Sequence, residues 1–184
     1  LNIKDQAPFN TCSWNSGVSQ KERDEQTPLS VRFAVVMGKR LGLISGDGFA
    51  NLRSIQYVTQ KYGICEESLL PKVNIPWNLY STINLSDEMV KNAEKHKSAS
   101  YWRVTNTSQM LKLLDEGRTI TIGTDWRMAF NMIGGFSMPW LLNFLISYVV
   151  GAHATLVCGY KKNYQGIPLV LKVENSFGSQ YGEQ

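Results

Sequence analysis

Hydrophobic residues in the first half of the chain recur at the spacing of amphipathic helices. This pattern predicts helices over residues 29–41 and 49–62. The apolar stripe of the first of these consists of Leu29, Phe33, Val36 and Met37. Gly63 follows the second, as expected of a residue that ends a helix. A further helix is predicted over 12–22, but this stretch is rich in poor helix formers, so it needs burial to be helical.

In the second half of the chain, apolar and polar residues alternate as they do in half-buried strands. The alternation is clearest at residues 119–125, where Ile120 and Ile122 face one way and the threonines face the other. Strands are predicted over 99–104, 119–125, 152–160 and 169–175, with a short helix over 108–116. Helices first and strands later predict an α+β fold with two segregated lobes and a site in the cleft between them.

Composition and charge narrow the classes of function. The chain has 184 residues, 43% of them hydrophobic and 18% charged, which is the balance of a globular protein rather than a disordered one. The net charge of +4 comes from scattered residues without an arginine-rich run, so we expect no nucleic-acid partner. The chain opens with neither an initiator Met nor a signal peptide, and we expect it to be an excerpt of a longer protein.

Residues 128–152 contain no charged side chain and are rich in large apolar residues, so a transmembrane helix has to be considered. The stretch is interrupted by Gly134, Gly135 and Pro139, and it carries two asparagines, which are costly inside a bilayer. We therefore expect a buried or cleft-lining segment and no membrane partner.

The cysteines of the chain are Cys12, Cys65 and Cys158. An odd number cannot form a complete set of disulfides, and no pair has the spacing of metal ligands. We therefore expect no metal and no cofactor, and thiols that indicate a reducing, cytoplasmic compartment or catalysis. Cys65 follows a helix end and Cys158 lies on a strand, so both are interpreted as structural residues. His96 lies in a charged stretch and is given no catalytic role.

The last two predicted strands flank a polar stretch at 161–166 that suits a hairpin turn. A hairpin centred on Tyr164 pairs His153 directly with Asn175, with their Cβ atoms about 5 Å apart. The amide oxygen then accepts from one imidazole N–H and fixes which ring nitrogen acts as a base. A slip of one residue in the pairing would put the two side chains on opposite faces.

A histidine held by an amide is a base in need of a nucleophile, and Cys12 is the best candidate. It begins the first predicted helix, after the capping candidates Asn10 and Thr11, and the positive end of a helix favours a thiolate. Cys12 would attack a carbonyl, His153 would protonate the leaving amine, and water would release the acyl group. The backbone N–H of Cys12 and the amide of Gln6 are the expected oxyanion donors.

These residues stand in blocks that resemble the papain-like cysteine peptidases. Gln6 precedes Cys12 by the family's spacing, and Ala152-His153-Ala154 opens an apolar strand that ends in Gly-Tyr. The stretch Asn175-Ser176-Phe177-Gly178, followed by Tyr-Gly-Glu, is similar to the family's Asn-Ser-Trp-Gly and Trp-Gly-Glu. The blocks occur in the family's order across nearly the whole chain, in a style closest to disulfide-poor prokaryotic or phage members.

The resemblance implies a papain-like two-lobe α+β fold in a single domain over 1–184. A helical lobe at about 10–98 would face an antiparallel, strand-rich lobe at about 99–184. The implied activity is that of a cysteine endopeptidase, a hydrolase whose Cys-His-Asn triad acts through a thioester without metal or cofactor. The implied partners are a polypeptide substrate and a pro-segment or protein inhibitor. Expected substrate-binding residues are Gly48, in a glycine loop, Gly151 and Ala152, beside the pocket for the residue two before the cut, and Phe177.

The sequence departs from the family pattern at two positions near the site. Ser13 stands between Cys12 and Trp14, where the family has an aromatic directly after the cysteine, and Phe177 replaces the tryptophan that shields the histidine. These departures motivate a catalytically weak homologue used for binding or assembly as one alternative. A papain-fold deconjugating or acyl-transfer enzyme, with the same triad but another substrate or acceptor, is the second alternative.

Overall fold

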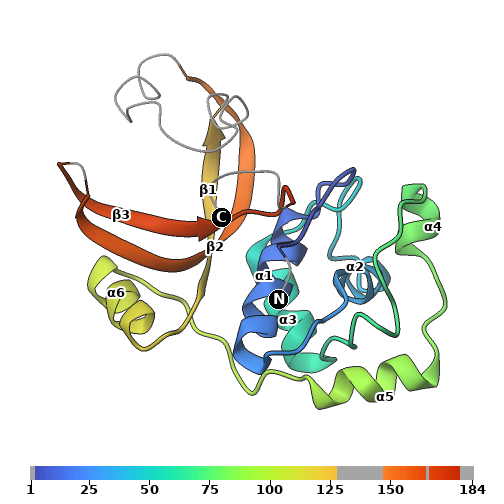
Figure 1. The fold of residues 1–184 in the computed structure, drawn as a ribbon. Helices are drawn as coiled ribbons and strands as arrows, with labels where there is room; N and C mark the ends of the chain where they lie inside the picture. Colours follow the sequence, from blue (N-terminus) through green and yellow to red (C-terminus); the bar gives the residue numbers. More distant parts are fainter. Residues whose placement is uncertain (1–2, 128–146, 165, 179–184) are drawn as a thin grey trace.

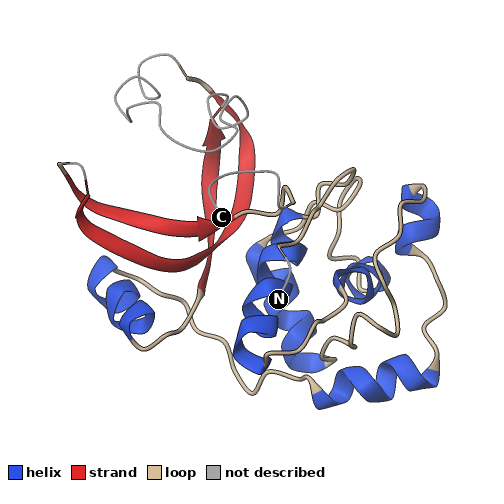
Figure 2. Cartoon of the chain, in the orientation of Figure 1, coloured by secondary structure: helices blue, strands red, loops and turns tan. Residues whose placement is uncertain are grey.

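The computed structural model describes residues 3–127, 147–164 and 166–178. The elements in chain order are α1 (Cys12–Glu25), α2 (Val31–Arg40), α3 (Leu52–Lys61), α4 (Trp77–Ser81), α5 (Asp87–Lys95), α6 (Thr107–Asp115), β1 (Ile120–Arg127), β2 (Val149–Tyr164) and β3 (Ile167–Glu174). Helices α1 to α5 gather on one side, and the antiparallel sheet with α6 lies on the other (Figures 1 and 2). The predicted mixture of helices and antiparallel strands is confirmed.

Helix α1 forms although its residues are poor helix formers, because it is buried between the other helices and the sheet. Its glycine allows a close approach to α3, since a Cβ atom on Gly17 would lie 2.5 Å from the side chain of Ile55. In the same way, the ring of Trp14 packs directly against Gly38 of α2, where a Cβ atom would clash with it. The helix runs three residues beyond the predicted end, to Glu25, and Gln26 then takes a left-handed conformation with φ 54°.

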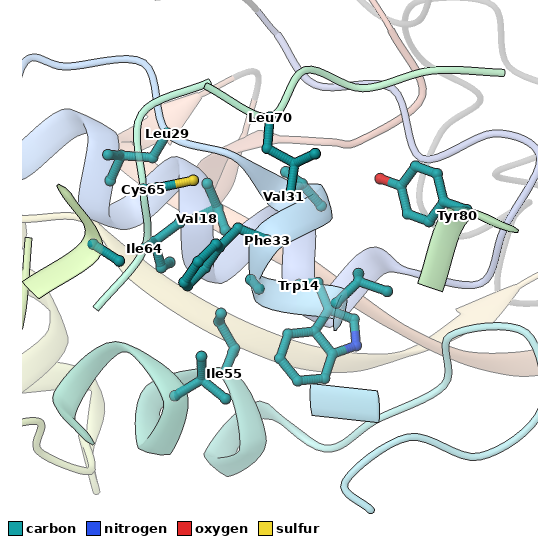
Figure 3. Packing of buried hydrophobic residues seen from close by; sticks show 14 of the residues in the cluster. Trp14, Val18, Leu29, Val31, Phe33, Ile55, Ile64, Cys65, Leu70 and Tyr80 are labelled. Carbon is teal, nitrogen blue, oxygen red and sulfur yellow. The ribbon is translucent and has the colours of Figure 1, made fainter. Parts of the chain in front are cut away.

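The predicted helices α2 and α3 are confirmed. Each begins two or three residues later than predicted, directly after the residue that caps it. The side chain of Ser30 accepts from the N–H of Phe33, and that of Asn51 accepts from the N–H of Ser54. The buried faces of α1, α2 and α3 form the larger hydrophobic cluster, which includes the side chains in Figure 3. Cys65 is fully buried in this cluster, and burial raises its pKa to about 12, so it is a structural thiol as predicted.

Two parts of the linking region differ from the sequence-based prediction. Helix α5 was not predicted, although its apolar and polar residues are separated on the helix; it is short, and Ala93 is its one buried residue. Its polar signals are present, since Ser86 caps it and acidic residues fill its first turn. The strand predicted over 99–104 is wrong: this stretch is irregular, and Trp102 is 87% exposed. A strand-like composition alone does not make a strand, because a strand also needs a partner; among the described residues no strand pairs with this stretch.

The sheet has the order β1-β2-β3, with both neighbouring pairs antiparallel. Ile120 and Ile122 of β1 share the face that packs on α6, where Leu114 and Val157 complete a second, smaller hydrophobic cluster. The hairpin between β2 and β3 closes at the pair Tyr164–Ile167, at the end of the predicted turn 161–166, whereas residues 161–164 of that stretch continue β2.

The predicted register of that hairpin is wrong by two residues. Glu174, the last residue of β3, pairs with Leu156, so the same register extended by one residue places Asn175 nearest Thr155 and not opposite His153. The pairing also shifts by one residue at a bulge between Val157 and Gly159. Asn175 remains on the same face as His153, as a diagonal neighbour, because positions two apart on a strand share a face.

None of the helices in the described ranges is long and apolar enough to cross a membrane. Of the uncharged stretch 128–152, residues 128–146 lie outside the described part of the chain. Its described end enters β2 at Val149.

Candidate active site

His153 and Asn175 are joined by a hydrogen bond of 2.7 Å between Nε2 and Oδ1. The same Oδ1 accepts the backbone N–H of Ser176 at 2.8 Å, which identifies it as an acceptor. Nε2 must therefore carry the proton of the neutral imidazole, and Nδ1 keeps its lone pair. The predicted contact thus exists, and it leaves Nδ1 as the basic nitrogen.

His153 is 6% exposed, and this burial lowers its pKa from the ordinary value of a histidine. The hydrogen bond to Asn175 acts in the opposite direction and raises the pKa, but it is the smaller of the two causes. On these two effects alone the imidazole is neutral at pH 7, in the form that can accept a proton.

Within the described ranges, two aromatic rings contact the imidazole of His153. Phe177 stacks on it with a centroid distance of 5.0 Å and an interplanar angle of 29°. Trp126, from β1, lies 4.5 Å away at an angle of 57°. The rings of Trp126 and Phe177 also contact each other, edge to face, at 5.5 Å and 85°. Phe177 therefore stands where the sequence predicts, and Trp126 is a neighbour that the sequence-based reasoning missed.

Gln6 is bound to the residue that follows Asn175. Its backbone N–H donates to the carbonyl oxygen of Ser176 at 2.7 Å, and the Ser176 hydroxyl donates to Gln6 Oε1 at 2.6 Å. A bridge between Asp5 and Phe177 continues this pairing. The structure therefore brings Gln6, Asn175 and His153 into one connected group.

Cys12 is the first residue of α1, a free thiol that is 8% exposed. Thr11 is the N-cap residue, but its hydroxyl accepts from the Asn15 side chain at 2.9 Å instead of capping the backbone. Within the described part of the chain no side chain caps this end of α1, so its first N–H groups can serve a bound anion. Helix α1 packs on β2, and its start lies beside the segment after β3 (Figure 1).

The loop of Gly48 lies directly against the residues that precede Cys12. Gly48 has φ +124°, and a Cβ atom there would come within 2.6 Å of the Thr11 side chain. Its carbonyl accepts from the indole N–H of Trp14 at 3.0 Å. Gly151 and Ala152 are exposed residues of β2 just before His153. The substrate-binding roles of these residues stay predictions.

The structure also tests the predictions for His96 and Cys158, which lie outside this group. His96 Nδ1 lies 2.6 Å from the Glu25 carboxylate at the end of α1, away from His153, and it plays no part in the group. The expectation that Cys158 is a core residue is wrong: it is partly exposed at the bulge of β2, and partial burial raises its pKa. A bulge turns a side chain away from the alternation that the prediction assumed.

Comparison with known proteins identifies the fold. No protein-family model matches the sequence, and a search of curated proteins finds no match. Among solved structures, xylellain, a cysteine protease from Xylella fastidiosa, matches with a TM-score of 0.81 and 22% identity, over 100% of this chain and 74% of that chain. Digestive procathepsin L 3 of Tenebrio molitor larval midgut matches with a TM-score of 0.72 and 18% identity, over 100% and 58%.

A third match is the Carica candamarcensis cysteine protease CMS1MS2, which was solved in complex with E-64. Its TM-score is 0.70 and its identity 16%, over 100% of this chain and 80% of that chain. These structures are papain-like cysteine proteases, and this chain shares their fold, as its motifs predicted.

Proposed function

We propose that this chain is a papain-fold cysteine endopeptidase, with Cys12 as nucleophile, His153 as general base and Asn175 as the residue that orients the base. Cys12 Sγ attacks the carbonyl carbon of a peptide bond, and its proton passes to His153 Nδ1. The imidazolium protonates the leaving amine as the C–N bond breaks, which leaves a thioester. Water then hydrolyses the thioester and regenerates the thiol.

The observation that carries this proposal is the bond between His153 Nε2 and Asn175 Oδ1. It gives the imidazole one tautomer and leaves Nδ1 free for a thiol on the neighbouring helix α1. The position of Cys12 at the uncapped start of α1 supports the same role, because the positive end of a helix favours a thiolate.

The oxyanion formed during the attack needs donors aimed at the carbonyl oxygen. The backbone N–H of Cys12 and the side-chain NH₂ of Gln6 fill this role in the proposal. The Gln6 amide suits it because the Ser176 hydroxyl occupies Oε1 and so fixes which end of the amide is the donor. Removal of one such donor typically costs about 10²–10³-fold in rate.

The substrate is a polypeptide that binds between a helical lobe at about 10–98 and a strand-rich lobe at about 99–184. Gly48, Gly151, Ala152 and Phe177 border this cleft in the proposal. A pro-segment or a protein inhibitor would occupy the same cleft. The procathepsin matched above is a proform and supports this partner class.

Alkylation with iodoacetamide between pH 4 and pH 9, with mapping of the modified cysteine, tests the proposal. We expect Cys12 to react well below pH 7, because a neighbouring imidazolium favours the thiolate over the thiol. Cys65 and Cys158 are internal controls, since burial raises the pKa of both thiols. Labelling of Cys12 that rises only near the pKa of a free thiol contradicts an activated nucleophile and favours a binding module.

A peptidase also has to release an amine from a peptide. Turnover of peptide substrates and of small protein conjugates can therefore be compared, with Cys12→Ala as control. This comparison separates an endopeptidase from a deconjugating or acyl-transfer enzyme. Turnover of conjugates or acyl transfer to an added amine, without cleavage of peptides, would contradict the endopeptidase.

A further inference from the structure

Trp126 reaches His153 because of its position in the sheet. Thr124 of β1 pairs directly with His153, and Trp126 pairs with Gly151 two residues along. Trp126 and His153 are therefore diagonal neighbours on one face, within reach of a large aromatic side chain. A Cβ atom on Gly151 would meet nothing within 4 Å, so the space opposite Trp126 is open, and the indole contacts the imidazole at a centroid distance of 4.5 Å.

The two aromatic neighbours of His153 come from different parts of the chain and contact it differently. Phe177 covers a face of the imidazole, nearly parallel to it. Trp126 meets the imidazole at a steep angle and stands at 85° to Phe177. Because the two rings also contact each other, they form an aromatic corner beside the imidazole, which a single stacked phenyl ring would not form.

We propose that Trp126 is a positioning residue for His153, whose indole excludes water from the bond between His153 Nε2–H and Asn175 and holds the imidazole with Nδ1 free. This inference rests on the proposed function of His153 as general base. The tryptophan that the sequence lacks after Ser176 is thus supplied by strand β1. A hydrogen bond shielded from water is stronger than an exposed one, and a held imidazole is less free to rotate.

The Nε2–H proton of His153 gives a direct test, because a shielded and hydrogen-bonded imidazole N–H exchanges slowly with water and is visible by NMR. The chain has two histidines, so His96 serves as an internal reference. In Trp126→Ala we expect the His153 N–H signal to be lost to solvent exchange, while the His96 ring signals stay in place. Trp126→Phe keeps an aromatic ring and is expected to retain the signal.

Trp102→Ala is the matched control, since Trp102 is 87% exposed and lies outside the sheet. It should leave the His153 N–H unchanged. If Trp126→Ala fails to fold, shown by altered His96 signals, Trp126→Leu decides the question, because it keeps an apolar side chain in the strand but opens the corner. An N–H signal in the Ala or Leu variant that exchanges as slowly as in the unchanged protein overturns the proposal.

The kinetic readout is the alkylation rate of Cys12 near pH 6. We expect Trp126→Ala to slow it between about 10-fold and 100-fold, since misplacement of a catalytic group by 1 Å can cost about 100-fold. The two failures are distinguishable. If the unchanged protein shows no reactive Cys12, the proposed peptidase fails while the N–H measurement still judges Trp126. If Cys12 is reactive and Trp126→Ala changes neither readout, the role of Trp126 alone fails.

Discussion

The Ser176 hydroxyl donates to Gln6 Oε1 at 2.6 Å, while the backbone N–H of the same serine donates to Asn175 Oδ1 at 2.8 Å. One buried residue therefore orients two side-chain amides. One of them holds the proposed base and the other is a proposed oxyanion donor. This double role makes Ser176 a residue whose side chain can be separated experimentally from its backbone.

Ser176→Ala removes the hydroxyl and keeps the backbone N–H. The Gln6 amide then loses the partner that fixes its direction, and we expect acylation to slow by less than the roughly 10²–10³-fold cost of deleting an oxyanion donor. Alkylation of Cys12 should be nearly unchanged, because it forms no oxyanion. Acylation kinetics and iodoacetamide labelling measure the two effects, with Ser108→Ala, at an exposed position of α6, as control. A large loss of alkylation would show that Ser176 mainly supports the fold.

Asn175→Ala leaves His153 Nε2–H without its acceptor, so either ring nitrogen can carry the proton. We expect turnover to fall roughly 10- to 100-fold. This loss is smaller than the full contribution of a general base, which is about 10²–10⁴-fold, because His153 itself is still present. Cys12→Ala should abolish turnover because it removes the nucleophile. Asn84→Ala, in an exposed loop, is the matched control. Equal losses from Asn175→Ala and Cys12→Ala would contradict the division of roles between them.

The pKa of His153 should depend on whether Cys12 is present. In Cys12→Ala no thiolate can stabilise the imidazolium, so burial dominates and the pKa lies below about 6.5, the ordinary value. The unfolded chain then binds more protons than the folded one just below that value, so the free energy of unfolding falls as the pH drops through it. In the unchanged protein a thiolate would raise the pKa.

NMR titration of the His153 ring and urea unfolding between pH 5 and pH 8 measure both effects. Identical pKa values in Cys12→Ala and in the unchanged protein would mean that Cys12 and His153 do not form an ion pair.

Gly48→Ala should disturb the start of α1. The added Cβ would lie 2.6 Å from the Thr11 side chain, and φ +124° is strained for any residue with a side chain, at a cost of about 1–3 kcal/mol. Because Thr11 precedes Cys12, we expect slower labelling of Cys12 as well as a lower midpoint of thermal unfolding. Gly46→Ala is the control, since φ is also positive there but a Cβ meets nothing within 4 Å. If both variants label Cys12 equally, the Gly48 loop does not position it.

The sequence predicts most of the fold, because helices and strands depend on local patterns. The buried faces of α2 and α3 and the strands β1 to β3 follow from periodicity. His153 and Asn175 were paired through a register that is wrong by two residues, and they still meet because positions two apart on a strand share a face. Trp126 was missed because its neighbours depend on the pairing of β1 with β2, and 21 residues outside the two strands separate Arg127 from Val149. The sequence could have identified Trp126 only through a prediction that Thr124 pairs with His153.

The errors have physical causes of the same kind. Helix α5 is short and strongly polar, and its one buried residue is Ala93, so it was missed despite its serine cap and the acidic residues of its first turn. Residues 99–104 have a strand-like composition, but a strand also needs a neighbouring strand, which a local pattern cannot supply. The register of the last hairpin failed because the turn closes at the pair Tyr164–Ile167 and is not centred on Tyr164, which displaces the pairing by three residues. The bulge at Cys158 restores one of them, and no composition rule marks either position.

The bulge at Cys158 also decides which changes of length the hairpin can tolerate. Between the bulge and the hairpin tip, Gly159 pairs with Lys172. If this register continued without the bulge, Asn175 would lie on the opposite face of the sheet from His153. The hairpin tip can therefore grow or shrink by equal numbers of residues on both strands without moving the pair. A single-residue insertion or deletion in one strand, between the bulge and Asn175, would separate them. Length variants of this protein should consequently be active when the two strands change together and inactive when one changes alone.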